Sequence, residues 1–392
     1  MNVYLDHAAT TPMPPEVIAA YAAALSVVGN PSSIHTQGQT AKRMLEEARE
    51  AVAAAVGAEP IEVTFTSGGT EAINLAIKGL WWARTLAGRV GEAVSGPTPA
   101  RILSTRAEHH ATIDALEWLE RHEGAVVEWI PVDSLGRIDL EALAAALGPD
   151  VAFVTTLWAN NEVGTVQPLA DIVALAAAHG VPVHADAVSA LGQLPIDFAA
   201  TGLAALSISA HKVGGPVGIG ALVTSRSTVV EPLLHGGGQQ RFRSGTHDAA
   251  GAHAFGVAAA RASSDLAGHA ARLTALRDHL IAGIRGAVPS AVLRGDPSDR
   301  VPGNAHFTFP GCEGDSLLYL LDVAGFSVST GSACRAGVPE ASHVLLAMGV
   351  PEREARGALR FTLGPTTTAD DVDSLAAALP TVVERARAAG LA

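Results

Sequence analysis

A lysine at the end of a predicted strand is the first residue whose position suggests chemistry. The chain has three lysines, and Lys42 and Lys78 fall in amphipathic helical segments, where we expect them to be solvated. Lys212 instead follows the apolar run LAALSISA (203–210) and precedes the glycine-rich turn GGPVGIG (214–220). A partly desolvated amine there has a lowered pKa and can form a Schiff base. A lysine in a surface turn is the alternative, and position alone does not separate the two.

A second candidate is the small-residue loop TSGGTEAIN (66–74), which joins the predicted strand IEVTFT (61–66) to a predicted helix. Free backbone N–H groups and the positive end of the helix dipole at such a junction favour a phosphate group, and the Thr70 hydroxyl adds a donor. Many glycine-rich turns bind nothing, so the loop alone is weak. Its spacing matches neither GxGxxG nor GxxxxGK[ST], which argues against a dinucleotide or a nucleoside triphosphate.

Asp186 ends another apolar run, VPVHAD (181–186). A carboxylate held there by a buried strand needs a cationic or hydrogen-bonding partner, and the protonated pyridine nitrogen of pyridoxal 5′-phosphate (PLP) is one. An aspartate that caps the next turn is the alternative. Taken together, a Schiff-base lysine, a phosphate loop and a buried aspartate are the three groups that a PLP enzyme requires.

The two cysteines differ in their surroundings. Cys334 lies in STGSACRAGVPEASH (329–343), a stretch of small residues typical of a loop, and Cys312 lies in PGCEGDSLL (310–318). Two cysteines outside a CxxC pair, in a chain whose start lacks a secretion signal, are expected to be thiols in a reducing compartment. Cys312 is expected to be a partly buried structural thiol.

The elements that must position these residues alternate along the chain. Short apolar runs alternate with alanine-rich helical runs up to about residue 255, which predicts a mainly parallel sheet covered by helices. A long helix at about 255–287 and short strands near 291–295, 304–309 and 326–330 predict a smaller α+β domain. We expect a large domain over 15–255 and a small domain formed by 1–14 and 256–392.

Composition narrows the class of protein. The chain has 392 residues, 48% hydrophobic and 17% charged, with a formal net charge of −13. That charge argues against binding to nucleic acid or to an anionic membrane, and no apolar stretch reaches the roughly 20 residues of a membrane span. The expectation is a cytoplasmic protein. A metal site is not expected, because His109 and His110 form the only adjacent histidine pair and no second ligand cluster has metal-site spacing.

Along nearly its whole length the chain resembles the cysteine desulfurases of the class V aminotransferase group. The matching motifs are YLDHAATTP (4–12), GNPSSIH (29–35), FTSGGTEAINLAIKG (65–79), EHHA (108–111), NNEVGTVQP (160–168), HADA (184–187), GQLPID (192–197), SAHKVGGPVGIGAL (209–222), HGGGQQRFRSGT (235–246), STGSAC (329–334) and RFTLG (360–364). The resemblance implies the fold type I architecture of PLP enzymes, with a mainly parallel seven-stranded sheet in an α/β/α sandwich plus a smaller α+β domain.

The resemblance also implies roles for individual residues. The implied cofactor-binding residues are Gly69, Thr70, His109, Asn161, Asp186, Ser189, Ser209, His211, Lys212 and Thr246. Lys212 would bind PLP covalently and Asp186 would pair with the pyridine nitrogen. Thr70, Ser209 and His211 would hold the phosphate, together with Thr246 from the second subunit of a homodimer.

On the same grounds, His109 would stack on the cofactor ring and move protons, while Asn161 and Arg360 would bind the substrate carboxylate. The alternative is that Arg360 forms a salt bridge on the protein surface and binds no substrate. The implied activity is the conversion of L-cysteine to L-alanine, with the sulfur held as a persulfide on Cys334. Because the thiolate is the attacking form, we expect a neighbour such as Arg335 or His109 to favour it. The persulfide sulfur would pass to an acceptor protein for iron-sulfur cluster assembly or for thiolation of tRNA or a cofactor.

Two positions depart from the family pattern. Ser189 stands where the family usually has glutamine. We expect its shorter side chain to fall short of the cofactor's phenolic oxygen, so that either a water bridges the gap or the activity is reduced. Arg335 follows the cysteine where a small hydroxyl residue is common. The alternatives are therefore a selenocysteine lyase or a C–S lyase on the same fold, or a catalytically weak component of an assembly system. The intact set of Lys212, Asp186, His109, Cys334 and Arg360 argues against the last.

Overall fold

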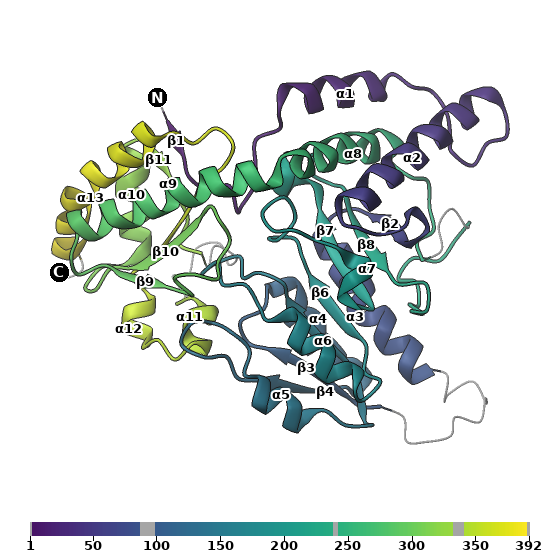
Figure 1. Cartoon of the computed structure of the whole chain (residues 1–392), viewed down its shortest axis with the longest axis horizontal. Coiled ribbons are helices and arrows are strands. Elements are labelled where there is room, and N and C mark those ends of the chain that lie inside the picture. Colours follow the sequence, from purple (N-terminus) through teal and green to yellow (C-terminus); the bar gives the residue numbers. More distant parts are fainter. Residues whose placement is uncertain (1, 87–98, 238–241, 332–340, 390–392) are drawn as a thin grey trace.

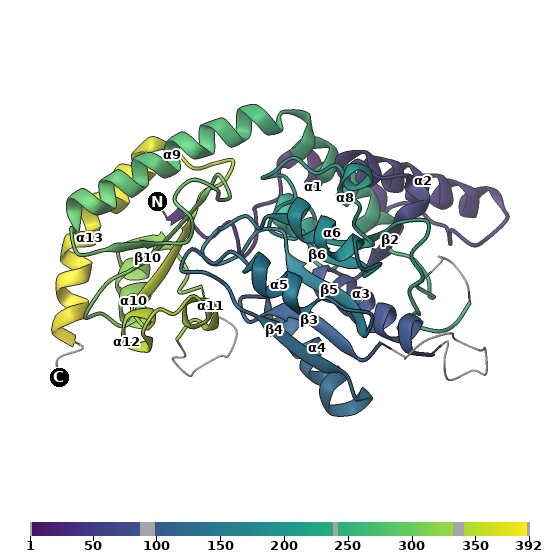
Figure 2. The ribbon, with the colours of Figure 1, turned by 60° about the horizontal axis from the view of Figure 1, so that its bottom comes forward.

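The computed structural model describes residues 2–86, 99–237, 242–331 and 341–389. Figures 1 and 2 show a larger lobe built on a central sheet and a smaller lobe that carries the C-terminal helix. The long helix α9 (Leu266–Ala287) runs from the first lobe over the second. Because candidate residues occur in both lobes, the way the lobes meet determines the site.

The larger lobe contains a seven-stranded sheet of order β2-β8-β7-β6-β5-β3-β4. Its strands are β2 (Val63–Thr66), β3 (Arg101–Thr105), β4 (Val126–Ile130), β5 (Val151–Leu157), β6 (Val183–Asp186), β7 (Ala205–Ser209) and β8 (Gly220–Thr224). Only β8 runs antiparallel to its neighbours, and the other described pairs are parallel. The mainly parallel seven-stranded sheet predicted from the sequence is confirmed.

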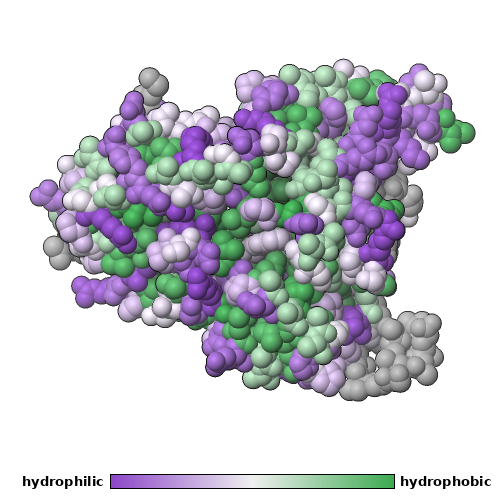
Figure 3. Space-filling model, viewed as in Figure 1, coloured by the Kyte–Doolittle hydropathy of each residue, from purple (hydrophilic) through white to green (hydrophobic). Residues whose placement is uncertain are grey.

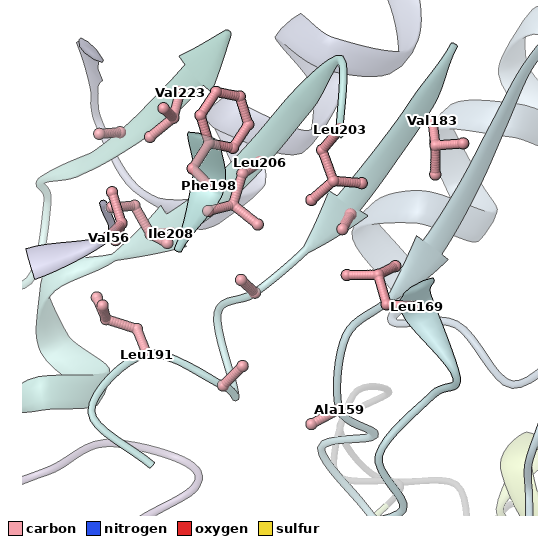
Figure 4. Close-up of a cluster of buried hydrophobic side chains, with 14 of the residues drawn as sticks. Val56, Ala159, Leu169, Val183, Leu191, Phe198, Leu203, Leu206, Ile208 and Val223 are labelled. Carbon is pink, nitrogen blue, oxygen red and sulfur yellow. The ribbon is translucent and has the colours of Figure 1, made fainter. Parts of the chain in front are cut away.

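Helices cover both faces of this sheet, as expected for strands that are apolar on both faces. One face packs against α3 (Gly69–Leu86) and α4 (His110–Glu123), and the other against α1 (Pro15–Leu25), α2 (Thr36–Ala55), α5 (Leu140–Ala146), α6 (Leu169–Ala177), α7 (Phe198–Thr201) and α8 (Ala249–Ser264). Figure 4 shows part of the second interface, where Phe198 and Leu203 lie beside the strand residues Leu206, Ile208 and Val223. The predicted α/β/α sandwich is therefore present.

The smaller lobe has its own hydrophobic core, centred on Phe307, Phe309 and Phe361. Its elements are β1 (Val3–Tyr4), α9 (Leu266–Ala287), β9 (Val292–Arg294), β10 (Asn304–Thr308), α10 (Gly314–Val323), β11 (Phe326–Ser327), α11 (His343–Ala347), α12 (Glu352–Ala355), β12 (Ala358–Thr362) and α13 (Ala369–Ala389). The antiparallel sheet has the order β12-β10-β9, and β1 pairs in parallel with β11. The N-terminal strand thus joins the C-terminal half of the chain.

The long helix expected at about 255–287 is wrong in one respect, because two helices occupy this region. The backbone leaves the helical conformation at Asp265, whose side chain accepts a hydrogen bond from Gly268 N at 3.3 Å and caps α9. Helix α8 packs along α2 of the larger lobe, whereas α9 packs on α13. A domain boundary at residue 255 falls inside α8, and the division of the chain into two domains stays a proposal.

The expectation that Lys78 is solvated is also wrong. Lys78 is half-buried on α3, with its Nζ 4.2 Å from the centroid of the Trp118 ring, and burial lowers its pKa. Lys42, in contrast, is exposed on α2. Figure 3 shows hydrophilic residues gathered over α2. Across the described parts of the chain, no helix combines the length and the apolar character needed to cross a membrane.

Candidate active site

A cavity of about 280 Å³ lies where the carboxyl ends of the parallel strands face the smaller lobe. Strands β5, β6 and β7 end here at Leu157, Asp186 and Ser209, the edge at which open parallel sheets place their ligands. The predicted site residues that line this cavity are Gly69, Thr70, His109, Asn161, Asp186, Ser189, Ser209, His211, Lys212 and Arg360. They come from six separate segments of the sequence.

Lys212 lies in the short 3-10 helix η2 (Ala210–Val213) that follows β7. Its Nζ donates hydrogen bonds to the carbonyl oxygens of Ala8 at 2.5 Å and Ala9 at 3.0 Å. The Thr11 hydroxyl in turn donates to the Lys212 carbonyl at 3.0 Å. The N-terminal segment thus holds the amine at the cavity, and a simple surface-turn lysine is ruled out.

Asp186 is 2% exposed at the end of β6. Its Oδ1 accepts a hydrogen bond from Val188 N at 2.9 Å. Burial raises the pKa of this carboxyl to about 6, and the Val188 N–H and the positive charge of Lys212 offset only part of that effect. A cationic group in the cavity would compensate the buried charge.

Glu108 is a second buried carboxyl near Asp186, at 1% exposure. Its Oε1 accepts from the Thr105 hydroxyl at 3.0 Å. Burial raises its pKa to about 8; hydrogen bonds from Leu157 and Thr105 lower it in part, and the Asp186 carboxylate raises it further. At neutral pH Glu108 is therefore mainly protonated and leaves Asp186 as the ionised member of the pair.

His109 is the N-cap of α4, and its Nδ1 accepts a hydrogen bond from Ala111 N at 3.0 Å. This bond places the ring proton on Nε2. Burial lowers the pKa of His109 to about 4, with further lowering by Lys212. The imidazole is therefore neutral at pH 7, and the expectation that it helps to favour the Cys334 thiolate stays a prediction. It remains able to donate from Nε2.

Three of the predicted phosphate residues, Thr70, Ser209 and His211, line the cavity. Thr70 lies in the first turn of α3, and Ser209 is 1% exposed at the end of β7. A Cβ atom on Gly69 would lie 2.9 Å from the Val188 side chain, so only glycine fits without movement. Nδ1 of His211 lies 3.4 Å from the Thr10 hydroxyl, and burial lowers the pKa of His211 to about 4.

Arg360 projects from β12 of the smaller lobe and is 5% exposed. Its Nη2 lies 2.8 Å from Oδ1 of Asp6, and its Nη1 donates to the carbonyl of Asn161 at 2.8 Å. Arg360 thus forms an ion pair with Asp6, but its guanidinium is buried, so the interpretation as a salt bridge on the protein surface is wrong. A buried guanidinium beside a polar cavity is suited to a substrate carboxylate.

Ser189 lines this cavity and also a smaller one of about 40 Å³, which Lys212 lines as well. The smaller cavity is also lined by His7 and Gln193, and the His7 ring nitrogens and Gln193 Oε1 have no hydrogen-bond partner among the described residues. This volume is sufficient for a water molecule.

Three predicted residues are not brought to the cavity in the described part of the chain. Thr246 is exposed and does not line it. Cys334 and Arg335 lie outside the described residues. Cys312 is 4% exposed, its Sγ is 3.7 Å from the Val383 carbonyl oxygen, and burial raises its pKa. It is therefore more deeply buried than expected, and its structural role stays a prediction.

Sequence reasoning missed several residues of the site. The carbonyl groups of Ala8 and Ala9 carry no signal in the sequence, because any residue supplies a carbonyl. Asp6 and Glu108 lie inside the quoted motifs, but neither was given a role. In residues 2–86, 99–237, 242–331 and 341–389, no group of three His, Cys, Asp or Glu side chains could hold a metal ion.

The donor set fits PLP. An amine, a buried carboxylate with a raised pKa, and small hydroxyl residues at a helix N-terminus match the aldehyde, the pyridine nitrogen and the phosphate of that cofactor. Lys212, Asp186 and the loop at Gly69–Thr70 would hold these three groups. The separate guanidinium of Arg360 leaves room for a substrate carboxylate.

Comparison with known proteins agrees with this assignment. The family model "Aminotransferase class-V" matches residues 3–375. An IscS-like cysteine desulfurase of Mycobacterium tuberculosis is 52% identical over 99% of this chain and 98% of its own length. A solved NifS-like protein has a TM-score of 0.89 and 33% identity over 98% of this chain and 100% of that chain. A solved structure described as SspA in complex with cysteine has a TM-score of 0.80 and 31% identity, over 93% of this chain and 100% of that chain. The chain therefore belongs to the class V aminotransferase family, within its PLP-dependent cysteine desulfurases.

Proposed function

We propose that this chain takes sulfur from L-cysteine, releases L-alanine and passes the sulfur to an acceptor protein. The observation that carries the proposal is the convergence of Lys212, Asp186 and Arg360 on one cavity of about 280 Å³. The names of the relatives support the reaction, and the complex of SspA with cysteine supports the substrate.

PLP, when bound, supplies an aldehyde that condenses with amines and a ring that accepts the electron pair released from the α-carbon. Lys212 would hold the cofactor and remove the α-proton of cysteine at Nζ. Asp186, kept ionised beside the protonated Glu108, would pair with the pyridine nitrogen. Lys212 enters this role already oriented by two backbone carbonyls.

His109 and Arg360 would act on the substrate. Neutral His109, with its proton on Nε2, can donate to an atom in the cavity. Arg360 would bind the cysteine carboxylate through its planar guanidinium, assisted by Asn161. Since the guanidinium is already oriented by Asp6 and by the Asn161 carbonyl, little ordering is lost on binding.

Cys334 is proposed as the sulfur carrier. Its thiolate would attack the substrate sulfur, forming an S–S bond while the Cβ–S bond breaks. Cysteine plus one thiol gives alanine plus one persulfide, so the step needs no external oxidant or reductant. The persulfide would serve iron-sulfur cluster assembly or thiolation of tRNA or a cofactor.

We also propose a homodimer. Thr246 is exposed and does not line the cavity of its own chain, although its motif is the one from which the second subunit would contribute to the phosphate site. The Thr246→Ala variant should therefore form dimers of the same size as wild type and bind PLP more weakly. A protein that sediments as a monomer with full cofactor content would contradict this.

The test of the function is direct. Purified protein should show the yellow absorbance of bound PLP and should release alanine from L-cysteine. Lys212→Ala should lose the absorbance and the activity, whereas Lys42→Ala, on the exposed face of α2, should keep both. A colourless wild-type protein that gains no activity when PLP is added would overturn the proposal.

A further inference from the structure

The cavity of about 40 Å³ that Lys212 lines, here called the small cavity, is also lined by three polar residues that the proposed reaction does not use. They are His7, at 5% exposure, Asn304, at 3% exposure, and Gln193. Both ring nitrogens of His7, Oε1 of Gln193 and Oδ1 of Asn304 are buried without a hydrogen-bond partner among the described residues. Buried polar atoms are almost always bonded to protein or to ordered water. The small cavity therefore has the lining and the volume of a hydration site.

His7 is held firmly beside this cavity. Its ring packs edge-on against the ring of Tyr4, with 5.0 Å between the centroids and 73° between the planes. The Thr11 hydroxyl lies 3.2 Å from the carbonyl oxygen of His7 and 3.0 Å from that of Lys212. Burial lowers the pKa of His7 to about 4, with further lowering by His269 and Arg272. At neutral pH the imidazole is therefore uncharged, with one nitrogen that donates and one that accepts.

The small cavity borders the proposed active site. The residues that line both this cavity and the one of about 280 Å³ are Ala8, Asn161, Val188, Ser189 and Lys212. Nζ of Lys212 donates a hydrogen bond to the carbonyl oxygen of Ala8 at 2.5 Å. The Lys212 amine is therefore bonded to a residue that the two cavities share.

A third cavity, of about 360 Å³, is here called the outer cavity. It shares His7, Gln193 and Lys212 with the small cavity. Its lining also includes exposed residues at the junction of α8 and α9, among them Arg261 and Arg272, so it reaches the protein surface. Lys212 thus lines all three cavities, while His7 and Gln193 line the small and the outer one.

The proposed reaction moves protons at Lys212. The amine removes the α-proton of cysteine, and alanine carries one more hydrogen on Cβ than cysteine does. We propose that water held in the small cavity by His7, Gln193 and Asn304 passes protons between the Lys212 amine and the outer cavity, with His7 as the positioning residue of that water. The ammonium form of Lys212 gives one proton to the water, and one proton leaves to solvent, which restores the amine. The inference rests on the proposed function, because Lys212 is the base there.

The first measurement concerns the water itself and needs no activity. A high-resolution crystal structure of the holoenzyme should show an ordered water within hydrogen-bond distance of His7, Gln193 and Asn304. His7→Phe, which keeps a ring against Tyr4 and removes both nitrogens, should lose or displace this water. A wild-type small cavity without ordered water would overturn the proposal.

The second measurement follows the α-deuteron of deuterated L-cysteine in ordinary water. Wild type should lose most of it to solvent. In His7→Phe the ratio of deuterium retained in alanine to deuterium lost should rise about 100-fold, the effect of misplacing a proton-transfer group. His7→Asn, which keeps a donor and an acceptor, should restore much of the loss. A purely structural role would change kcat or KM and leave this ratio unaltered, because the ratio compares two fates of one deuteron.

Two further variants complete the test. Gln193→Leu should also raise the retained fraction, and it serves if His7→Phe does not fold. His179→Phe, at an exposed position after α6, is the control and should match wild type. An unchanged ratio in both His7→Phe and Gln193→Leu, or complete retention of deuterium by wild type, would overturn the proposal. If wild type makes no alanine, the proposed function fails, whereas deuterium loss from unreacted cysteine still measures proton exchange at Lys212.

Discussion

Asp6 and Arg360 lie 354 positions apart in the sequence, yet Oδ1 of one is 2.8 Å from Nη2 of the other. Their elements meet because β1 pairs with β11, and Asp6 itself forms a β-bridge to Thr362, the last residue of β12. The pair orients a buried guanidinium toward the cavity. The N-terminal segment that carries Asp6 therefore helps to orient Arg360 at the proposed carboxylate site.

Arg360→Lys should raise the KM for cysteine about tenfold or more, with a smaller fall in kcat. An ammonium group supplies a point charge and no planar fork, so it cannot bind a carboxylate while keeping the contacts to Asp6 and Asn161. Steady-state kinetics of alanine formation measure both constants. Arg353→Lys, exposed on α12, is the matched control, and an unaltered KM for Arg360→Lys would exclude the carboxylate role.

Asp186→Asn should lower kcat about 100-fold or more, because a neutral amide cannot stabilise a protonated pyridine nitrogen. The amide keeps the shape of the side chain, so the fold should persist. Absorbance spectra with and without cysteine would report whether the cofactor still binds. Asp171→Asn on the exposed face of α6 should change nothing, and an Asp186→Asn enzyme with wild-type kcat would refute the pairing.

The raised pKa of Glu108 predicts that the free energy of unfolding depends on pH. Its pKa is raised from 4.5 to about 8 in the fold, so between these values the folded state binds more protons than the unfolded state. Its contribution to the free energy of unfolding is fully present below about pH 4.5 and is lost as the pH rises through 8, a decline of roughly 5 kcal/mol. Denaturant unfolding of wild type and Glu108→Gln from pH 5 to 8 measures it. The difference in unfolding free energy should shift in favour of the variant as the pH rises, and a constant difference would show that Glu108 is ionised throughout.

Ser189→Gln should increase kcat up to about tenfold, by extending a donor into the small cavity that Ser189 borders. Ser189→Ala should not increase it, because it shortens the side chain further. Alanine release under saturating cysteine compares the two. A fall in activity with both variants would indicate that the serine hydroxyl itself is required.

Much of the fold could be predicted because buried strands leave a strong local signal. The runs ending at Thr105, Asp186 and Ser209 are apolar on both faces, and the structure places strands there. The break between α8 and α9 was missed because alanine-rich sequence continues on both sides. Asp265, a good N-cap after two serines, was the available signal.

Site residues could be predicted where a residue type is unusual for its position in the sequence. They could not be predicted where their role depends on a contact between segments that only the folded chain brings together. Lys212 and Asp186 stand at the ends of apolar strands, which marks them locally. The hydrogen bonds from Lys212 to the carbonyls of Ala8 and Ala9, and the contact of Arg360 with Asp6, join segments far apart in the chain. No local pattern encodes such contacts.

The central claim is that Cys334 receives the sulfur of cysteine in a cavity built around Lys212. The most direct measurement is a single turnover with sulfur-labelled cysteine, in which protein-bound label and free alanine are quantified together. Wild type should yield one persulfide on Cys334 for each alanine, and Cys334→Ala should yield neither while it keeps its PLP absorbance. Alanine formed at the wild-type rate by Cys334→Ala would contradict the account.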